Sequence, residues 1–286
     1  KWFVEKTKPY CAIFIKSELW PNCFKTLHQN SIPTFVVSAI FKPQHYLFKS
    51  YGKWHLKILR EVSHFFVQNE QSKDLLKQNN IHQATVSGDN RYDKVFENSI
   101  QPREIPLIES FRNAHPLVVA GSTYKIDSKM LIRVSKRMPK VKFILAPHHT
   151  ELAKQLVKDG LLYSKADTKN VKNHNILIID NIGILSQLYQ YANVSYVGGA
   201  FGNGLHNILE PLAFGSSVIF GPKHLHYEEA EAAIKAGVAQ GINNDTDLEK
   251  AISQIIRNPK KNDALAFISK RKGANKLIID TINTVL

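Results

Sequence analysis

The sequence predicts an α/β protein built on two parallel β-sheets. Short apolar or β-branched segments alternate with segments of helical periodicity along the whole chain, which is the pattern of βαβ units. A polar stretch with two prolines, residues 98–106, interrupts the alternation and is the expected linker. The length of 286 residues and the 43% hydrophobic content allow two domains. We therefore expect two Rossmann-like domains facing across a cleft.

The first expected domain covers residues 1–105 and is the shorter one. Four strands are expected at 11–15, 34–38, 64–67 and 84–86, with helices at 20–29, 46–60 and 70–78. Apolar and aromatic residues recur at helical spacing through 46–60, which indicates one continuous helix there.

The second expected domain covers residues 106–286 and alternates more regularly. Its expected strands are 117–120, 142–146, 176–179, 194–197 and 217–220. Its expected helices are 127–137, 150–158, 183–191, 207–214, 228–236, 247–257 and a long final helix from about Asp263. That last helix is free to pack back on the first domain. Ligands of such sheets bind beyond the carboxyl ends of the strands, so the loops there are the place to search for a site.

The charge of the chain favours anionic partners. Lysine and arginine number 38 against 24 acidic residues, a formal net charge of +14, which suits anionic lipid, phosphorylated substrates or nucleic acid. The excess is spread along the chain without a basic tail, which weakens the nucleic-acid interpretation. Two cysteines and no C-x-x-C pair argue against a disulfide framework and structural zinc. No apolar run reaches the roughly 18 residues of a membrane span.

Two short motifs follow expected strands of the second domain. Ala120-Gly121-Ser122-Thr123 offers a small residue, two hydroxyls and free amides, which suit a phosphate, although a turn with a helix cap explains it as well. Pro147-His148 follows the next strand, and an imidazole there is placed to meet an anion. The adjacent His149 is better explained as an incidental residue at a helix start.

Two more motifs follow expected strands of the second domain. Residues 180–185 put Gly183 between apolar residues, where backbone could lie against a flat base or form a simple turn. The stretch 197–213 is the most informative: four glycines after a strand, then His206-Asn207-Ile208-Leu209-Glu210-Pro211. Asn207 and Glu210 have the spacing of a capping box. An unpaired carboxylate at this position is costly to bury, so Glu210 is expected to bind ribose hydroxyls.

These motifs resemble those of one enzyme family. The glycine-rich loop followed by His-Asn-x-Leu-Glu-Pro and residues 213–222 resembles the donor site of GT-B glycosyltransferases. The whole chain resembles, more narrowly, the 3-deoxy-D-manno-octulosonic acid (Kdo) transferases of lipopolysaccharide synthesis. The matching segments, in family order, are 17–22, 86–93, 120–123, 147–148, 182–185 and 206–211.

The resemblance implies an activity and a set of site residues. Such enzymes transfer Kdo from CMP-Kdo to a lipid A precursor (lipid IVA), with inversion and without a metal or other cofactor, at the cytoplasmic face of the bacterial inner membrane. Glu18 and Arg91 match catalytic positions, and at the second the family commonly has lysine. The implied donor-binding residues are Ser122, Thr123, Pro147, His148, Gly183, Ile184, Leu185, Gly202, Asn207, Ile208, Leu209 and Glu210. The implied partners are CMP-Kdo, the glycolipid acceptor and an anionic membrane surface, with no nucleic acid.

The resemblance also implies that part of the family pattern lies upstream of residue 1. Family members carry an apolar anchor and a catalytic glutamate in the earlier part of the N-terminal domain, and this sequence contains neither. The N-terminal domain is therefore expected to be incomplete, and the chain is expected to bind nucleotide better than it turns it over.

Two other functions remain open at this stage. The chain could be another GT-B enzyme that uses a UDP-sugar, either a transferase or an epimerase, because its strand-end loops would look similar. It could also be a non-catalytic basic module that binds RNA or an anionic membrane. Phe65 and Phe66 are the nearest candidates for stacking on RNA bases, but neighbours in a strand point to opposite faces, which favours core packing.

Overall fold

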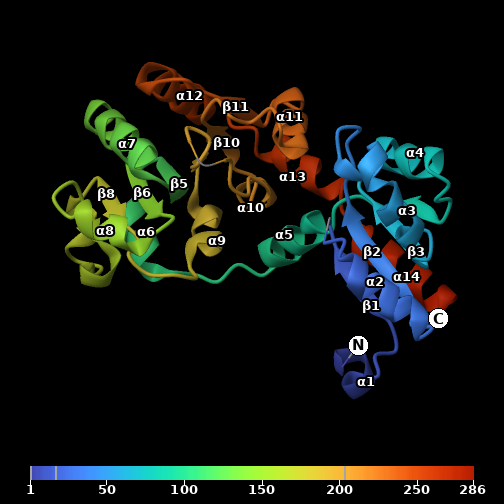
Figure 1. Ribbon diagram of the computed structural model, residues 1–286. Helices are drawn as coiled ribbons and strands as arrows, with labels where there is room; N and C mark the ends of the chain where they lie inside the picture. Colours follow the sequence, from blue (N-terminus) through green and yellow to red (C-terminus); the bar gives the residue numbers. More distant parts are fainter. Residues whose placement is uncertain (1, 17, 203) are drawn as a thin grey trace. The chain divides into compact units, whose positions relative to one another are not determined.

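The computed structural model describes residues 2–16, 18–202 and 204–286 and divides the chain into two compact units. Unit 1 consists of Lys1–Lys94 and Arg271–Leu286, and unit 2 is Val95–Lys270 (Figure 1). The division falls inside helix α5 (Arg91–Ile100), earlier in the chain than the boundary at residue 105 that the prolines suggest. Unit 1 is therefore discontinuous in sequence.

Unit 1 contains a parallel four-stranded sheet in the order β1-β2-β3-β4. Its strands are β1 (Ala12–Ile15), β2 (Thr34–Ala39), β3 (His64–Val67) and β4 (Ala84–Val86). Its helices are α1 (Trp2–Thr7), α2 (Pro21–Gln29), α3 (Lys53–Leu59), α4 (Glu70–Gln78) and α14 (Ala274–Val285), with α5 beginning at its end. The helix expected over 46–60 is wrong in its first half, which forms the 3-10 turns Tyr46–Phe48 and Ser50–Gly52.

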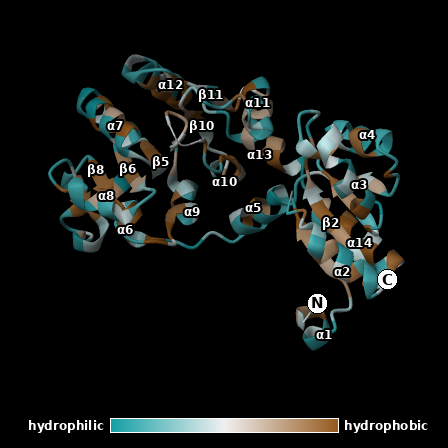
Figure 2. Cartoon of the chain, in the orientation of Figure 1, coloured by the Kyte–Doolittle hydropathy of each residue, from teal (hydrophilic) through white to brown (hydrophobic). Residues whose placement is uncertain are grey.

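The final helix covers one face of this sheet. Phe35, Val37 and Phe66 on β2 and β3 pack with Ala274, Ile278 and Ile282 of α14 in one buried cluster. The strand residues share a face because side chains alternate along a strand, and the helix residues share a stripe because they recur every four positions. Figure 1 shows α14 beside β2, and Figure 2 shows hydrophobic residues on both. Residues from the two ends of the chain thus complete one core.

Unit 2 contains a parallel seven-stranded sheet in the order β11-β10-β9-β5-β6-β8-β7. The strands are β5 (Leu117–Thr123), β6 (Lys142–Pro147), β7 (Leu161–Leu162), β8 (Ile176–Ile178), β9 (Val194–Val197), β10 (Ser217–Phe220) and β11 (Ala239–Gly241). The helices are α6 (Pro106–Arg112), α7 (Lys125–Arg137), α8 (Thr150–Gln155), α9 (Leu185–Leu188), α10 (Leu209–Ala213), α11 (Glu228–Lys235), α12 (Asp245–Arg257) and α13 (Lys261–Ser269). Most of α5 also belongs to this unit. The 3-10 turns are Tyr163–Lys165, Val171–Asn173 and Tyr189–Tyr191.

The strand order places a topological switch point between β5 and β9. β5 lies at the centre, with β6 on one side and β9 on the other, and Gly121 of β5 is level with Val197 of β9. Connections from these strands leave in opposite directions, which opens a crevice at their carboxyl ends. The α/β class of two Rossmann-like units is therefore confirmed, and the loops after residues 121 and 197 are brought together.

The structure differs from expectation at two element ends that matter for the site. β5 continues through Thr123 instead of ending at Ala120, with a register irregularity between Gly121 and Thr123. The long C-terminal helix expected from Asp263 is wrong: α13 ends at Ser269, and Gly273, with φ of +117°, separates it from α14. Glycine adopts this left-handed conformation without steric cost, so the break has a local cause.

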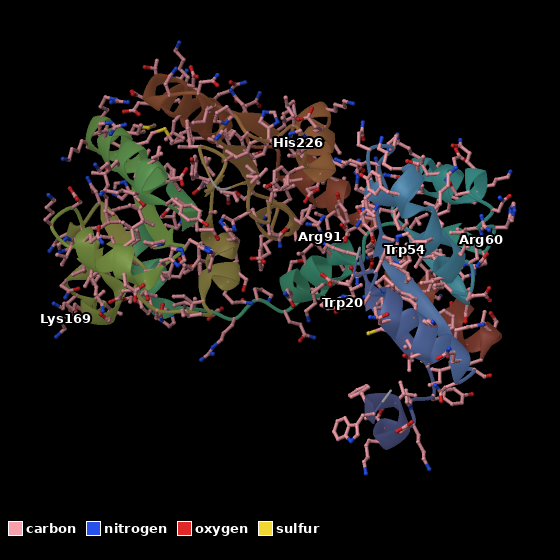
Figure 3. The ribbon with its side chains drawn as sticks, viewed as in Figure 1. Trp20, Trp54, Arg60, Arg91, Lys169 and His226 are labelled. Atoms are coloured by element: carbon pink, nitrogen blue, oxygen red, sulfur yellow. The ribbon has the colours of Figure 1, made fainter. Side chains whose placement is uncertain are left out.

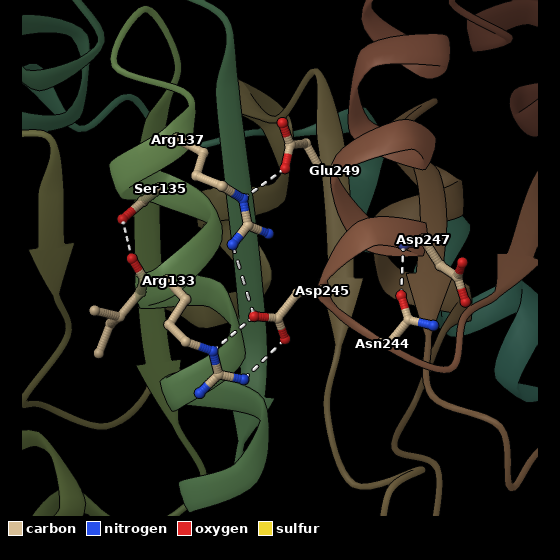
Figure 4. Close-up of polar contacts among 8 residues, drawn as sticks. Arg133, Ser135, Arg137, Asn244, Asp245, Asp247 and Glu249 are labelled. Atoms are coloured by element: carbon tan, nitrogen blue, oxygen red, sulfur yellow. Dashed lines mark hydrogen bonds and ion pairs between the residues drawn. The ribbon is translucent and has the colours of Figure 1, made fainter.

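Helices α7 and α12 are joined on the surface of unit 2 by a charged network (Figure 4). Arg133 makes two hydrogen bonds to the Asp245 carboxylate, at 2.6 and 2.8 Å, and Arg137 Nε lies 2.7 Å from a Glu249 oxygen. The side-chain hydrogen bond from Arg133 holds the pKa of Asp245 below its ordinary value. The pairing fixes the start of α12 against the middle of α7.

Within the described ranges, no helix combines the length and the apolar character that crossing a bilayer requires.

Candidate functional site

The floor of the crevice is backbone from two neighbouring strands. The Gly198 amide donates to the Gly121 carbonyl at 2.9 Å, and a Cβ on Gly198 would lie 2.3 Å from the Ser122 carbonyl oxygen. Only glycine fits at this contact. Ser122 itself has φ of +52°, a left-handed bulge at the end of β5. The two turns that the sequence singled out therefore touch each other through their main chains.

The two hydroxyl residues of the first motif face different ways. Ser122 is half-buried at the rim, whereas Thr123 is fully buried and its hydroxyl accepts a hydrogen bond from Ser128 at 3.0 Å. Because the Thr123 side chain is fully buried, a contact between it and a phosphate, as the motif predicts, would require the end of β5 to open. In this arrangement Ser122 is the hydroxyl at the rim.

The second motif enters the crevice from β6. The His148 amide donates to the Thr123 carbonyl at 3.0 Å, which ties this turn to the end of β5. The His148 ring is exposed and lies 5.1 Å from the Tyr124 ring and 4.5 Å from the His206 ring, centroid to centroid. Pro147 is half-buried beside it as the last residue of β6. Imidazoles from two separate loops thus meet at the switch point.

A buried carboxylate fixes these loops from below. Asp127, in the first turn of α7, is 1% exposed and accepts hydrogen bonds from the Tyr124 amide at 2.8 Å and the Gly199 amide at 3.3 Å. The Tyr196 hydroxyl donates to its second oxygen at 2.6 Å. Burial and the neighbouring Asp127 raise the pKa of Tyr196, so it remains a donor. Asp127 therefore connects α7, β9 and the glycine loop.

The third motif lies against the same strand end. Gly183 is exposed with φ of +100°, while Ile184 and Leu185 are half-buried against the core. A Cβ on Gly121 would lie 3.0 Å from a methyl carbon of Leu185 and 2.0 Å from the hydroxyl of Tyr189. The glycine at position 121 thus leaves the space that these two side chains fill. The helix expected over 183–191 is shorter, beginning at Leu185 and continuing as the 3-10 turn 189–191.

The fourth motif supplies a polar pair. The Asn207 side-chain amide donates to Glu210 at 3.0 Å, and its oxygen accepts from the Leu209 amide at 3.1 Å. Helix α10 begins at Leu209, two residues later than expected, so the predicted capping box is replaced by this side-chain pair. Burial raises the pKa of Glu210, while the Asn207 hydrogen bond opposes the rise. The half-buried carboxylate is thereby held in one orientation.

The other predicted residues of this motif present no side chain to a ligand. Gly202 is exposed, whereas Ile208 and Leu209 are buried with their side chains in the core. Asn203, which belongs to the same predicted loop, lies outside the described residues. A direct ligand contact at 208 and 209 would therefore come from main-chain atoms.

The two expected catalytic residues lie in unit 1, and the other twelve expected site residues lie in unit 2. Glu18 is exposed and accepts a hydrogen bond from the Trp20 indole at 2.8 Å. Arg91, at the start of α5 (Figure 3), forms an ion pair with Asp89 at 2.7 Å. Ser17, in the same motif as Glu18, lies outside the described residues. The Glu18 and Arg91 side chains therefore already interact with neighbours in unit 1.

Sequence reasoning missed three residues that the fold brings to this edge, namely Tyr124, Asp127 and Tyr189. Each is one to four residues from a predicted motif residue. His206 belongs to the fourth motif, but the sequence assigned it no role. The switch-point rule, applied to every residue following β5, would have drawn attention to Tyr124.

The described residues also contain no group of three or more histidine, cysteine, aspartate or glutamate side chains placed to hold a metal ion.

Comparison with known proteins finds similarity to sugar-transferring enzymes. Residues 1–94 match the family described as 3-deoxy-D-manno-octulosonic-acid transferase (kdotransferase). The Kdo transferase of Rickettsia conorii is 26% identical over 298 residues, covering 97% of this chain and 61% of the relative. A bifunctional glycosyltransferase/methyltransferase of Fusobacterium nucleatum is 27% identical over 274 residues, covering 91% of this chain but 43% of the relative. The chain thus spans about two fifths of the Fusobacterium relative and three fifths of the Rickettsia relative.

Solved structures share the fold at low sequence identity. The C-terminal CMP-Kdo binding domain of WaaA from Acinetobacter baumannii aligns with a TM-score of 0.50 and 16% identity, over 62% of this chain and 97% of that domain. The UDP-GlcNAc 2-epimerase of Neisseria meningitidis aligns with a TM-score of 0.62 and 15% identity, over 99% of this chain and 78% of the enzyme. The resemblance that the sequence motifs predict is confirmed: this chain is related to the 3-deoxy-D-manno-octulosonic acid transferases.

Proposed function

We propose that this chain carries the donor site of a glycosyltransferase that moves Kdo from CMP-Kdo to a lipid A precursor. The reaction would break the bond between the sugar and the CMP phosphate and form a bond to an acceptor hydroxyl, with inversion and without a metal ion. The acceptor, lipid IVA, and the anionic inner-membrane face are part of the same proposal. The match of residues 1–94 to the Kdo transferase family supports the identity of the sugar.

The observation that carries the proposal is the convergence of the predicted motifs on one switch point. Four loops after β5, β6, β8 and β9 meet there, and they bring the main chain of 121–123, His148, Gly183 and the Asn207–Glu210 pair to the same edge. Such an edge is where open α/β sheets bind nucleotides. The arrangement offers amides and imidazoles for a phosphate and a fixed carboxylate for sugar hydroxyls.

Glu210 has the chemistry of a ribose ligand. Its carboxylate is partly desolvated, and within the described residues Asn207 donates a hydrogen bond to it. A partly buried anion gains from further donors, and two vicinal hydroxyls supply two. The leaving phosphate would gain charge during the reaction, and the Ser122 hydroxyl and the His148 imidazole would stabilise it.

Calorimetry of CMP binding tests this role. Glu210→Ala should weaken binding by about tenfold or more, which corresponds to roughly 1.4 kcal/mol. Glu210→Gln should lose most of the same affinity, because its amide both removes the charge and presents donors to the hydroxyls.

A matched control keeps the test specific. Glu249→Gln changes an acid of α12 that pairs with Arg137 on the surface of the same unit, and it should leave CMP affinity unchanged. Equal affinity in Glu210→Ala and the unaltered protein would remove Glu210 from the site.

The alternative nucleotide is distinguished by competition. An enzyme that uses a UDP-sugar should prefer UMP to CMP, and the epimerase fold matches give this alternative a structural basis. We expect CMP to displace UMP at equal concentration. The reverse order would overturn the assignment to CMP-Kdo while keeping the fold and the site.

The basic-module alternative has its own readout. A protein that binds RNA through its charge alone should bind single-stranded RNA with a steep dependence on salt. Phe65 and Phe66, the proposed stacking residues, are fully buried in the sheet of unit 1, so we expect no such binding.

A further inference from the structure

Three aromatic rings of unit 2 form a compact cluster at the switch point. The Tyr124 and His206 rings are stacked, with centroids 5.6 Å apart and planes 21° apart, and the Tyr124 hydroxyl lies 3.2 Å from His206 Nε2. The His148 ring completes the triangle at 4.5 Å from His206 and 5.1 Å from Tyr124. The three residues come from the loops after β5, β6 and β9. The fold has therefore placed two imidazoles side by side where a nucleotide phosphate is expected.

The surroundings of His206 favour its neutral form when the site holds no anion. Burial lowers the pKa of His206, the neighbouring His148 lowers it further, and Asp127 opposes these effects. His149 approaches the cluster through ring contacts with His148 at 4.6 Å and Tyr124 at 6.1 Å. The carboxylate of Asp127 is already occupied by three donors.

The glycine loop confines His206 on its other side. A Cβ on Gly199 would lie 3.0 Å from His206 Cδ2, and the Tyr227 hydroxyl lies where a side chain on Gly204 would be. The ring is thus held between Tyr124 and the loop, with Nε2 directed to the Tyr124 hydroxyl. It cannot easily turn away from His148 to avoid a second positive charge.

An anion reverses the electrostatic balance of such a pair. Two imidazoles in contact disfavour a second proton through like-charge repulsion. A dianionic phosphate beside both rings favours their charged forms and thereby offsets the repulsion and the desolvation. By linkage, binding that raises a pKa through the working pH must take up protons.

We propose that His148 and His206 form a proton-linked anion site, in which binding of a phosphomonoester dianion adds a proton to the pair. Tyr124 is the positioning residue that holds the His206 ring against His148. The proposal rests on the proposed function in taking the phosphate of CMP as the anion. It goes further by assigning His206 and Tyr124 to the site and by making nucleotide affinity depend on pH.

Calorimetry in two buffers of different ionisation enthalpy measures the protons taken up per CMP. At pH 7.5, where the CMP phosphate is a dianion because its second pKa is about 6, we expect about 0.5 to 1 proton per CMP. Cytidine, which lacks the phosphate, should bind with no uptake. Affinity for CMP should fall by about threefold to tenfold per pH unit between pH 7 and 8.5.

The variants assign the uptake to the rings. His206→Gln and His148→Gln should each change the proton number and weaken CMP binding, and the double variant should lower the proton number to near zero. Tyr124→Phe keeps the ring stack but removes the hydroxyl, so it should shift the pH profile while CMP still binds. His115→Gln is the matched control, because His115 lies before the opposite end of β5 and contacts the Lys140 carbonyl at 3.2 Å.

The outcomes separate this proposal from the proposed function. CMP binding without proton uptake, or equal uptake with cytidine, overturns the proton-linked site and leaves the nucleotide site intact. Failure of CMP to bind overturns the nucleotide site. Inorganic phosphate then tests the anion site alone, through NMR titration of the imidazole signals in the unaltered protein. Unmoved His148 and His206 signals at saturating phosphate or CMP would overturn the proposal even if the variants fail to fold.

Discussion

Replacing Asp127 should loosen the glycine loop and the strand before it. The Asp127 carboxylate accepts from two backbone amides and one phenol while 1% exposed. Asp127→Ala would leave these three donors without their acceptor, and each unsatisfied buried donor costs about 1–3 kcal/mol. Tyr124 is half-buried, so water can partly replace the lost acceptor there. We therefore expect the unfolding free energy of unit 2 to fall by about 3–5 kcal/mol.

Tyr196→Phe is the graded companion of this change. It removes one donor, the phenol at 2.6 Å, and leaves Asp127 its two amides. A hydrogen bond to a charged acceptor contributes about 1.5–3 kcal/mol, so the expected loss is smaller than for Asp127→Ala. The double variant should lose less than the sum, since both changes remove the same bond.

The assay must report on the correct unit. All three tryptophans, at positions 2, 20 and 54, lie in unit 1, so their fluorescence does not follow the change directly. Hydrogen-exchange mass spectrometry resolves the peptides separately. Protection in β9 and residues 198–206 should fall by at least about 100-fold, at tenfold for each 1.4 kcal/mol. Exchange in β2 and β3 should stay the same.

A small effect would refute this reasoning. If Asp127→Ala lowers protection in β9 by less than about tenfold, a change below about 1.4 kcal/mol, the carboxylate does not hold the loop. An equal loss in β2 and β3 would point to global destabilisation instead of loss of a local anchor.

Three other changes test separate parts of the structure. Gly121→Ala should lower stability by about 1–3 kcal/mol by overpacking, because its Cβ would meet the Tyr189 hydroxyl; chemical denaturation measures this, and adding Tyr189→Phe should restore part of the loss. Asp245→Asn should cost no more than about 1 kcal/mol, as expected for an exposed ion pair. The contribution of this ion pair depends on pH because the pKa of Asp245 is lowered in the folded state. The pair stabilises the protein above the unfolded pKa of about 4, and this stabilisation is lost as the pH falls through the folded value. The difference between variant and parent should therefore vanish in acid, and a difference that persists there would contradict the pairing. Trp54→Glu should weaken flotation with anionic liposomes, since Trp54 is 57% exposed (Figure 3) beside the exposed Lys53 and Lys57 and aromatic and cationic residues favour such surfaces; Lys169→Glu, on unit 2, is the charge control.

The sequence predicted the parts of the fold that depend on local pattern. The strands β5, β6, β8, β9 and β10 of unit 2 contain nearly continuous apolar runs, so their positions followed directly, whereas the short strands β7 and β11 were not predicted. The end of β5 was missed because a left-handed serine at 122 prolongs pairing where hydroxyl residues suggested a turn. The break between α13 and α14 was missed because the sequence is helical on both sides of Gly273, and this one glycine decides the break.

The site was predicted less completely for a physical reason. Motif residues such as Asn207 and Glu210 interact within a few positions, so their spacing could be interpreted. Tyr124, His148 and His206 meet only because β5, β6 and β9 are neighbours in the sheet. Thr123 illustrates the opposite case, since its hydroxyl has a local partner, Ser128, that the motif did not reveal. Contacts of this kind follow from strand order, which one sequence specifies only indirectly.

The discontinuity of unit 1 has a consequence for synthesis on the ribosome. Phe35, Val37 and Phe66 are covered by a helix that follows the 176 residues of unit 2. At about 5–20 residues per second, translation of that stretch takes roughly 10–35 s. During that time this apolar face of the nascent sheet lacks α14, so we expect chaperones to bind it. Ribosome-bound chains stalled before residue 271 should be more sensitive to protease than chains that include α14.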